Sequence, residues 1–208
     1  MIKYFKTEDD FRDFLNKFYL TEIGFGTEGV AYFDMRNDRV IKTLDDKMYN
    51  PEKLITEDDI KLDSFKFPKD LYVCNDELLG YSSSYFRGDL FNDNTYGRYK
   101  RIDLIKLLNA SKVMLKDINS LTDNHIYSYD LYSNMMFDGN VLAACDTLNY
   151  YRDYSDDLDE KNLSNYIYSL NYELSIRLTD YNYDFNSSFE DNVNDYMKKR
   201  GTSKVLIR

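Results

Sequence analysis

The chain has 208 residues, of which 43% are hydrophobic and 16% aromatic, enough for one ordinary domain or two small lobes with a real core. The formal net charge of −10 argues against a general nucleic-acid binder and against an anionic membrane surface as the main partner, because both repel an acidic protein. Two cysteines and one histidine exclude a disulfide scaffold and a multi-histidine metal site.

The first residues, MIKYFKTEDDF, lack the apolar segment of a secretion signal, and no run in the chain is long and apolar enough to span a membrane. We therefore expect a soluble, cytoplasmic protein in a reducing compartment. Delivery into another cell without a cleaved signal stays open, since such export leaves no apolar leader.

The N-terminal part of the chain predicts one helix followed by three strands. Thr7 and Asp10 have the spacing of a capping box, and phenylalanines and a leucine recur behind them at helical spacing. This pattern predicts an amphipathic helix over 8–18. Three strands are expected next, at residues 19–25, 29–34 and 40–44.

The next part continues with β-type segments. Asn50-Pro51 predicts the start of a short helix, because proline fits the first helical position. Two further strands, 67–73 and 78–86, are separated by the turn CNDE. The strand-rich half of the chain ends at a break near 87–100.

From about residue 101 the pattern becomes helical. One face of a long helix is traced by Leu104, Leu107, Leu108, Ser111, Met114, Leu115 and Ile118. Two short strands, NMMF and VLAAC, then flank the turn DGN, and the tail over 157–200 is expected to be mostly helical and polar. This layout predicts an α+β fold with two lobes, residues 1–86 and 87–208.

The most specific stretch of the first half is IGFGTEGVAYFDMRNDRVIK, which places Gly24, Gly26 and Gly29 before a β-prone segment and Lys42. A glycine triplet also serves hairpins and bulges, and Lys42 alone can be a solvated strand end. A dinucleotide-binding loop is excluded, because it opens directly into a helix. A lid over a phosphate chain remains, since bare backbone approaches phosphates closely and Lys42 can reach them.

The second motif, HIYSYDLYSNMMFDGNVLAACDT, resembles the catalytic-loop and metal-binding segments of the protein kinase-like superfamily. Asp130 corresponds to the catalytic-loop Asp, Asn134 to the metal-binding Asn and Asp146 to the Asp that opens the DFG segment. Each residue alone is better explained as a turn residue in an Asn- and Asp-rich chain. The order of the whole set, glycines included, carries the resemblance, which covers about residues 19–150.

The resemblance implies a two-lobed kinase-like fold, with an antiparallel sheet in the N-lobe and a reduced helical C-lobe, and it implies ATP and Mg²⁺ as cofactors. The glycine loop would clamp the phosphates and Lys42 would position them. Asn134 and Asp146 would hold the metal, which prefers oxygen ligands. Asp130 would orient the attacking hydroxyl and take its proton.

The resemblance also implies a carboxylate partner for Lys42 and a hinge that holds the adenine edge. Glu52, in the first turn of the predicted short helix, is the expected partner, and Glu57 is the alternative. Glu52 is preferred because the residues after it resemble a new helix cap, although either glutamate can simply favour a helix N-terminus. The hinge is expected at Ser84 to Phe86.

The chain departs from the family pattern in several places. Asp130 and Asn134 are four residues apart where five is usual, and Ser128-Tyr129 replaces the preceding His-Arg. Asp146 is followed by Thr-Leu instead of Phe-Gly, and the chain has no Ala-Pro-Glu segment. Only 62 residues follow Asp146, so most of the large helical lobe is expected to be absent or reduced.

Two further features have simpler explanations. His125, the single histidine, is expected to be structural and not a general base. The acidic run DYSDDLDE at 153–160 is expected to be a solvated loop, although a basic substrate would be drawn to it.

The leading hypothesis is an ATP- and Mg²⁺-dependent kinase that acts on Ser, Thr or Tyr of a protein substrate. One alternative is a small-molecule kinase for an antibiotic or a sugar, which usually needs a longer chain. The other is a nucleotide-binding pseudokinase, in which the shortened loop fails to place Asp130.

Overall fold

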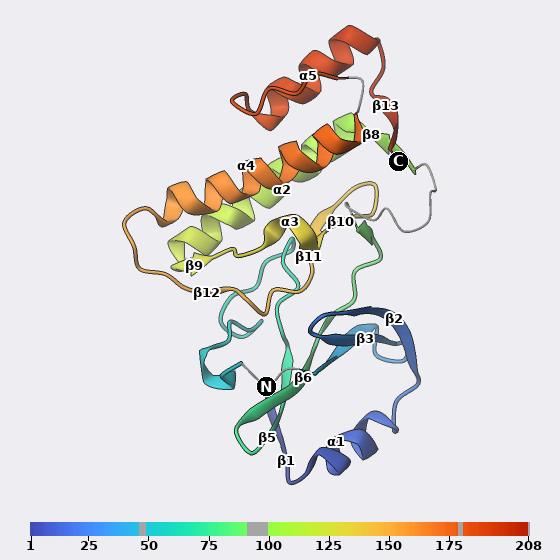
Figure 1. The fold of residues 1–208 in the computed structure, drawn as a ribbon, viewed down its shortest axis with the longest axis vertical. Coiled ribbons are helices and arrows are strands. Elements are labelled where there is room, and N and C mark those ends of the chain that lie inside the picture. The colour runs from blue at the N-terminus through green and yellow to red at the C-terminus, as the bar shows by residue number, and fades with distance from the viewer. Residues whose placement is uncertain (46–48, 91–99, 179–180, 208) are drawn as a thin grey trace. The chain divides into compact units, whose positions relative to one another are not determined.

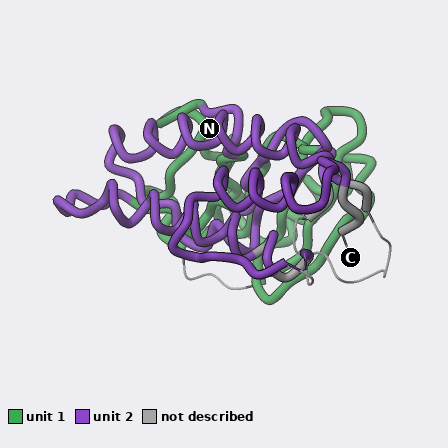
Figure 2. Tube along the Cα trace, turned by 90° about the horizontal axis from the view of Figure 1, so that it is seen from above, with its two compact units in different colours: residues 1–61, 66–86, 147–151 green, residues 62–65, 87–146, 152–208 purple. Residues whose placement is uncertain are grey.

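The computed structural model describes residues 1–45, 49–90, 100–178 and 181–207, and its architecture is α+β (Figure 1). Within these residues it contains five α-helices and one mixed six-stranded sheet. Contacts divide the chain into two compact units (Figure 2): residues 1–61, 66–86 and 147–151, and residues 62–65, 87–146 and 152–208. The grouping differs from a single division after residue 86, because two short segments change sides.

The first unit is built on the six-stranded sheet, in the order β1-β5-β6-β4-β3-β2. Its strands are β1 (Ile2–Phe5), β2 (Leu20–Gly26), β3 (Gly29–Asp34), β4 (Arg39–Leu44), β5 (Asp70–Cys74) and β6 (Glu77–Ser84). β1 pairs in parallel with β5, whereas all the other neighbours are antiparallel. The antiparallel part follows from short turns, which join β2 to β3, β3 to β4 and β5 to β6.

The first helix, α1 (Glu8–Leu15), begins with the predicted capping box. The Thr7 hydroxyl accepts from the Asp10 backbone N–H at 3.1 Å, and the Asp10 carboxylate accepts from the Thr7 N–H at 3.1 Å. The helix is three residues shorter than the predicted 8–18, because the chain after Leu15 bends in turns that still carry Phe18 towards the sheet. Its buried Phe11 joins a core cluster with Ile41, Tyr72, Cys74 and Leu79.

A second core cluster contains Leu44, Leu71, Val73, Leu78, Tyr81 and Leu148. Because side chains alternate along a strand, Lys42 and Leu44 leave β4 on the same face of the sheet. Leu148 comes from the late segment 147–151, more than 100 residues further along the chain than β4. The face of the sheet that bears Lys42 is therefore completed by a distant segment.

The second unit is mostly helical. Its helices are α2 (Leu104–Asp123), α3 (Leu131–Asn134), α4 (Leu158–Arg177) and α5 (Phe189–Arg200). α2 and α4 lie side by side (Figure 1), joined by the bond from the Tyr166 hydroxyl to the Ser111 carbonyl. The long helix expected from residue 104 is confirmed, and the polar tail forms two helices with a terminal strand.

The short strands of this part of the chain are β7 (Asp89–Leu90), β8 (Lys100–Asp103), β9 (Ile126–Tyr127), β10 (Met135–Phe137), β11 (Leu142–Ala144), β12 (Tyr151–Arg152) and β13 (Lys204–Ile207). β10 and β11 form the predicted hairpin around the turn DGN, and β7 pairs with the other edge of β10. β8 pairs with β13.

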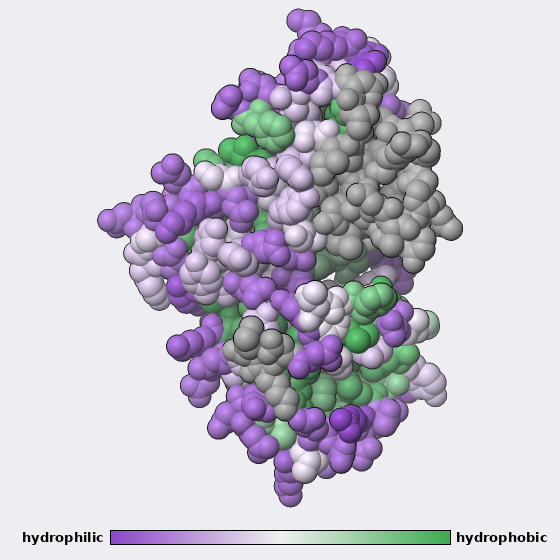
Figure 3. Space-filling model, viewed as in Figure 1, coloured by the Kyte–Doolittle hydropathy of each residue, from purple (hydrophilic) through white to green (hydrophobic). Residues whose placement is uncertain are grey.

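No helix in the described parts of the chain is both long and apolar enough to cross a membrane. In the view of Figure 3, hydrophilic side chains cover most of the described surface. This agrees with the large excess of acidic residues.

Candidate functional site

The glycine stretch forms the β2–β3 hairpin, in which Thr27 and Glu28 make a two-residue turn between Gly26 and Gly29. Gly29 is required by the fold, because its φ is +146° and an added Cβ would lie 1.9 Å from the Thr43 carbonyl oxygen. Gly24 and Gly26 differ: a Cβ there would meet no described atom within 4 Å. Packing leaves these two glycines unexplained, and they keep a strip of the hairpin bare.

Lys42 lies on β4, between Ala31 of β3 and Tyr81 of β6, and its side chain is 12% exposed. Its ammonium group donates to Glu28 Oε2 at 2.8 Å. The expected position of Lys42 is thus observed, on the third strand of the β2–β3–β4 meander.

Two further side chains bind the same carboxylate, and we call the group Glu28, Lys42, Tyr49 and Asn149 the Glu28 cluster. Asn149 Nδ2 donates to Glu28 Oε1 at 3.3 Å. The Tyr49 hydroxyl lies 3.0 Å from Glu28 Oε1 and 2.9 Å from Asn149 Oδ1, so its single proton serves one acceptor at a time. The cluster joins the hairpin turn, β4 and the 147–151 segment within the first unit.

The pKa of Glu28 reflects these contacts. Burial alone would raise it, but hydrogen bonds from Lys42, Tyr49 and Asn149, with the charge of Lys42, hold the pKa below its usual value. Glu28 is therefore ionised at neutral pH, and Lys42 faces a full negative charge.

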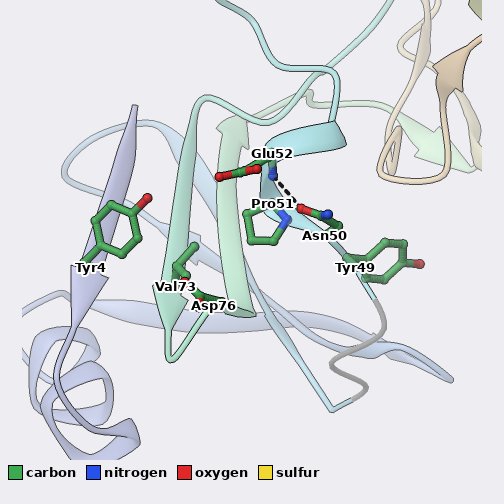
Figure 4. Close-up of a pocket in the computed structure, with 7 residues that line it drawn as sticks. All are labelled: Tyr4, Tyr49, Asn50, Pro51, Glu52, Val73 and Asp76. Carbon is green, nitrogen blue, oxygen red and sulfur yellow. Dashed lines mark hydrogen bonds between the residues drawn. The ribbon is translucent and has the colours of Figure 1, made fainter.

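The expected pairing of Lys42 with Glu52 is wrong, and so is the alternative with Glu57. Glu52 lies in a single 3₁₀ turn (Pro51–Lys53), where its backbone N–H donates to Asn50 Oδ1 at 3.0 Å. Its carboxylate lines a pocket of about 500 Å³, and Figure 4 shows it pointing away from Tyr49. The lining residues are Tyr4, Tyr49, Asn50, Pro51, Glu52, Val73 and Asp76. Glu57 lies 4.0 Å from Lys69.

The physical reason for the correction is the hairpin turn. The Asp45 N–H donates to the Glu28 carbonyl at 2.9 Å, so the turn is fastened to the end of β4. The positive φ of Gly29 permits this close approach. A two-residue connection between glycines was the available signal in the sequence, because it predicts a tight turn folded against the next strand.

Asp130 and Asn134, which the resemblance assigns to a catalytic loop, lie in the second unit. Asp130 precedes α3 with a left-handed backbone (φ 50°), and its carboxylate makes no capping hydrogen bond. Asn134 ends α3, and its Nδ2 donates to the Asp130 carbonyl at 3.0 Å. The four-residue spacing therefore forms a compact loop closed by the Asn134 side chain.

Asp146 is brought to the same place by the β10–β11 hairpin. The Cys145 N–H donates to the Asn134 carbonyl at 3.0 Å. Asp146 is the next residue after Cys145, so this bond brings it close to Asn134. Asp146 also has a left-handed backbone (φ 63°), a conformation that Asp tolerates better than most residues. The structure thus gathers Asp130, Asn134 and Asp146 around one hairpin end.

The donor set fits a magnesium ion that is completed by other ligands. Within the described residues, no three or more His, Cys, Asp or Glu side chains are grouped to hold a metal by themselves. Asn134 and Asp146 supply an amide oxygen and a carboxylate, and the Asn134 amide nitrogen is already used by the loop. Mg²⁺ is commonly held by one or two such side chains together with phosphate oxygens and water.

The chain connects this loop directly to the Glu28 cluster. The residues after Asp146 belong to the first unit: the Thr147 hydroxyl donates to the Lys66 carbonyl at 3.3 Å, and Leu148 joins the core. Asn149 then binds Glu28. Three peptide units separate Asp146 from Asn149 along the chain.

The predicted hinge residues follow the end of β6. Ser84 is the exposed last residue of that strand and pairs with Arg39. Beyond it, the centroids of the Tyr85 and Phe33 rings lie 4.2 Å apart, with the rings tilted by 35°. The Lys66 ammonium lies 5.6 Å from the centroid of the Phe86 ring. Binding of an adenine at Ser84 and Phe86 stays a prediction.

His125 and the acidic run lie in structural contacts. The His125 ring packs 4.9 Å from the Tyr154 ring, and its carbonyl accepts from the Asp153 N–H at 2.8 Å. Asp153 and Asp157 both pair with Lys161, at 3.3 and 2.8 Å. The run therefore leads into α4 and is partly neutralised there.

No protein-family model matches the chain, and a search of curated proteins finds no match.

Proposed function

We propose that the protein is an ATP- and Mg²⁺-dependent phosphotransferase with a two-lobed kinase-like fold, acting on Ser, Thr or Tyr hydroxyls of a protein. One observation carries the proposal. Glu28 in the turn of the glycine hairpin binds Lys42 and also accepts from Asn149, only three residues after the aspartate assigned to the metal. A hairpin with no such downstream link would support a structural role only.

The residues have separable roles in this proposal. The backbone at Gly24 and Gly26 approaches the phosphates, and Lys42 supplies the positive charge that binds them. Asn134 and Asp146 hold the magnesium, which neutralises negative charge on the phosphate oxygens. Asp130 takes the proton of the acceptor hydroxyl. Placement and charge matter here more than intrinsic reactivity.

The test is transfer of the labelled γ-phosphate of ATP to the protein itself or to a lysate, in the presence of Mg²⁺. Asp130→Asn and Asp146→Asn are the informative variants, because Asn also tolerates a left-handed backbone. We expect both to reduce labelling at least about a hundredfold.

The matched control is Asp138→Asn, at the turn of the same β10–β11 hairpin, where the carboxylate accepts from the backbone N–H groups of Asn140 and Val141. It is expected to retain labelling. Equal labelling by the wild type, Asp130→Asn and Asp146→Asn would refute the proposal.

A non-catalytic nucleotide-binding protein is the second candidate, and the compact loop favours it. The amide nitrogen of Asn134 donates to the Asp130 carbonyl. This bond links Asn134, the proposed metal ligand, to Asp130, the proposed proton acceptor. ATP with Mg²⁺ would then raise the melting temperature without phosphate transfer to any acceptor.

A further inference from the structure

Three segments of the first unit converge on one carboxylate. The Glu28 carboxylate accepts hydrogen bonds from Lys42 on β4, from Tyr49 in the segment before the 3₁₀ turn and from Asn149 in the segment after Asp146. Its carbonyl accepts from Asp45 as well. Stabilising a hairpin turn requires far fewer contacts, and none with a residue 121 positions away.

The pair is better shielded than an ordinary surface ion pair. The side chains of Lys42 and Glu28 are 12% and 30% exposed, so screening by water is reduced. A lysine has a long flexible stem and no preferred direction of its own. The bond to Glu28 fixes the direction of the Lys42 ammonium.

Glu28 also fixes the position of the glycine hairpin. Glu28 is part of the turn of the glycine hairpin, so its bonds to Lys42 and Asn149 set the distance between the bare strip at Gly24 and Gly26 and the ammonium group. Movement of the hairpin away from β4 would require breaking all of these bonds together.

We propose that Glu28 is the positioning residue for Lys42: it directs the ammonium to the phosphate chain and couples the glycine hairpin to the segment that follows Asp146. The role rests on the proposed function, because it assumes a nucleotide triphosphate at Lys42. Glu28, a residue of the glycine hairpin, would thus pair with Lys42 in the way that was expected from the sequence for a glutamate in a helix.

The first measurement is the affinity for ATP in the presence of Mg²⁺, by calorimetry, for the wild type, Glu28→Gln and Glu22→Gln. Glu22 lies exposed on β2 of the same hairpin, so its variant removes the same charge without touching the Glu28 cluster. We expect Glu28→Gln to raise the Kd about tenfold and Glu22→Gln to change it less than about twofold. Tighter binding by Glu28→Gln would contradict the proposal, because it would mean that Glu28 only repels phosphate.

The second measurement needs no nucleotide. The rate at which an amine-acylating reagent modifies Lys42 is followed by mass spectrometry at pH 8. The hydrogen bond to Glu28 at 2.8 Å holds the amine in the wild type. Without that bond, Glu28→Gln should react several-fold faster than the wild type or Glu22→Gln. Equal rates would overturn the pairing.

The failures are distinguishable. A wild type that binds no ATP refutes the proposed function and this role with it. A wild type that binds ATP, with Glu28→Gln binding as well as Glu22→Gln, refutes the role of Glu28 alone. Tyr49→Phe, which removes one neighbour of Glu28 and keeps the ion pair, is expected to weaken binding less than Glu28→Gln.

Discussion

At the scale of single residues, the glycines of the hairpin differ in the reason for having no side chain. Gly29 is held at φ +146° against the Thr43 carbonyl, whereas Gly24 lies in open space. We predict that Gly29→Ala lowers the free energy of unfolding by about 3 kcal/mol, from backbone strain and overpacking. Gly24→Ala is expected to change it by less than about 1 kcal/mol.

Urea denaturation of the two variants measures the difference. Gly24→Ala, which folds normally, should nevertheless weaken ATP binding, because its methyl group would stand where the phosphates approach. Equal destabilisation by the two alanines would contradict the structural difference between the sites.

Asp34 gives a pH-dependent prediction. It is fully buried and accepts from Asn37 Nδ2 at 2.7 Å and from Arg39 Nε at 3.1 Å. Burial alone would raise the pKa of Asp34, but the hydrogen bonds from Asn37 and Arg39, with the Arg39 charge, lower it from the usual 3.8. Since the folded pKa is the lower one, the ionised carboxylate stabilises the fold above that usual value, and this contribution is lost as the pH falls through the folded pKa.

We therefore expect Asp34→Asn to cost about 2 kcal/mol at pH 7 and progressively less below about pH 4. Chemical denaturation of both proteins between pH 3 and pH 7 measures this difference. A gap that stays constant, or that widens in acid, would contradict the lowered pKa.

At the scale of elements, the loop that carries Asp130 is held by α4. Asn162 is fully buried, and its Oδ1 accepts from the Ser128 N–H at 2.8 Å and from the Ser128 hydroxyl at 2.9 Å. Its Nδ2 donates to the Ile126 carbonyl at 2.9 Å and to the Thr122 hydroxyl at 3.0 Å. The Asn162 amide therefore anchors the segment before Asp130, where the chain lacks the His-Arg pair of the kinase pattern.

We predict that Asn162→Ala lowers the free energy of unfolding by about 3 kcal/mol, because several buried polar groups lose their partner. The matched control is Asn140→Ala, which removes an exposed amide bonded to Lys106 and should cost less than about 1 kcal/mol. Denaturation curves compare them, and similar losses would show that Asn162 does not anchor the loop.

The elements that were predictable are those with local signals. The capping box, the β2–β3–β4 meander and the long α2 follow from turn residues and periodicity within a few positions of each other. β1 was not predicted. Its parallel partner β5 lies far along the chain, and the two strands are not joined by a short turn that would indicate the pairing. The polar tail gave no signal for the break between α4 and α5.

The candidate site shows the same division. Lys42 and the glycines lie on the strands and turn expected from the sequence, because both depend on local patterns. The partner of Lys42 was missed, since no role was assigned to Glu28 from the sequence and Asn149 reaches it from 121 residues away. Side-chain pairs of this kind depend on register and tertiary packing, which periodicity does not encode.

At the scale of the whole molecule, the chain passes several times between the two compact units. One of these passages, the segment 147–151, contributes to the stability of the first unit. Its Leu148 is only 2% exposed and lies in the core of that unit. We predict that Leu148→Ala lowers the free energy of unfolding by about 3 kcal/mol. Leu163→Ala, at a 37% exposed position of α4, should cost less than half as much in the same denaturation experiment.

The measurement that tests the central claim most directly uses an acyl-phosphate derivative of ATP, whose acyl group is transferred to a lysine amine lying at the phosphates. We predict that Lys42 is the labelled residue, that free ATP with Mg²⁺ blocks the labelling, and that Asp146→Asn reduces it strongly. Labelling of other lysines only, or labelling of Lys42 that is unaffected by both ATP and Asp146→Asn, would show that Lys42 and Asp146 do not serve a common nucleotide.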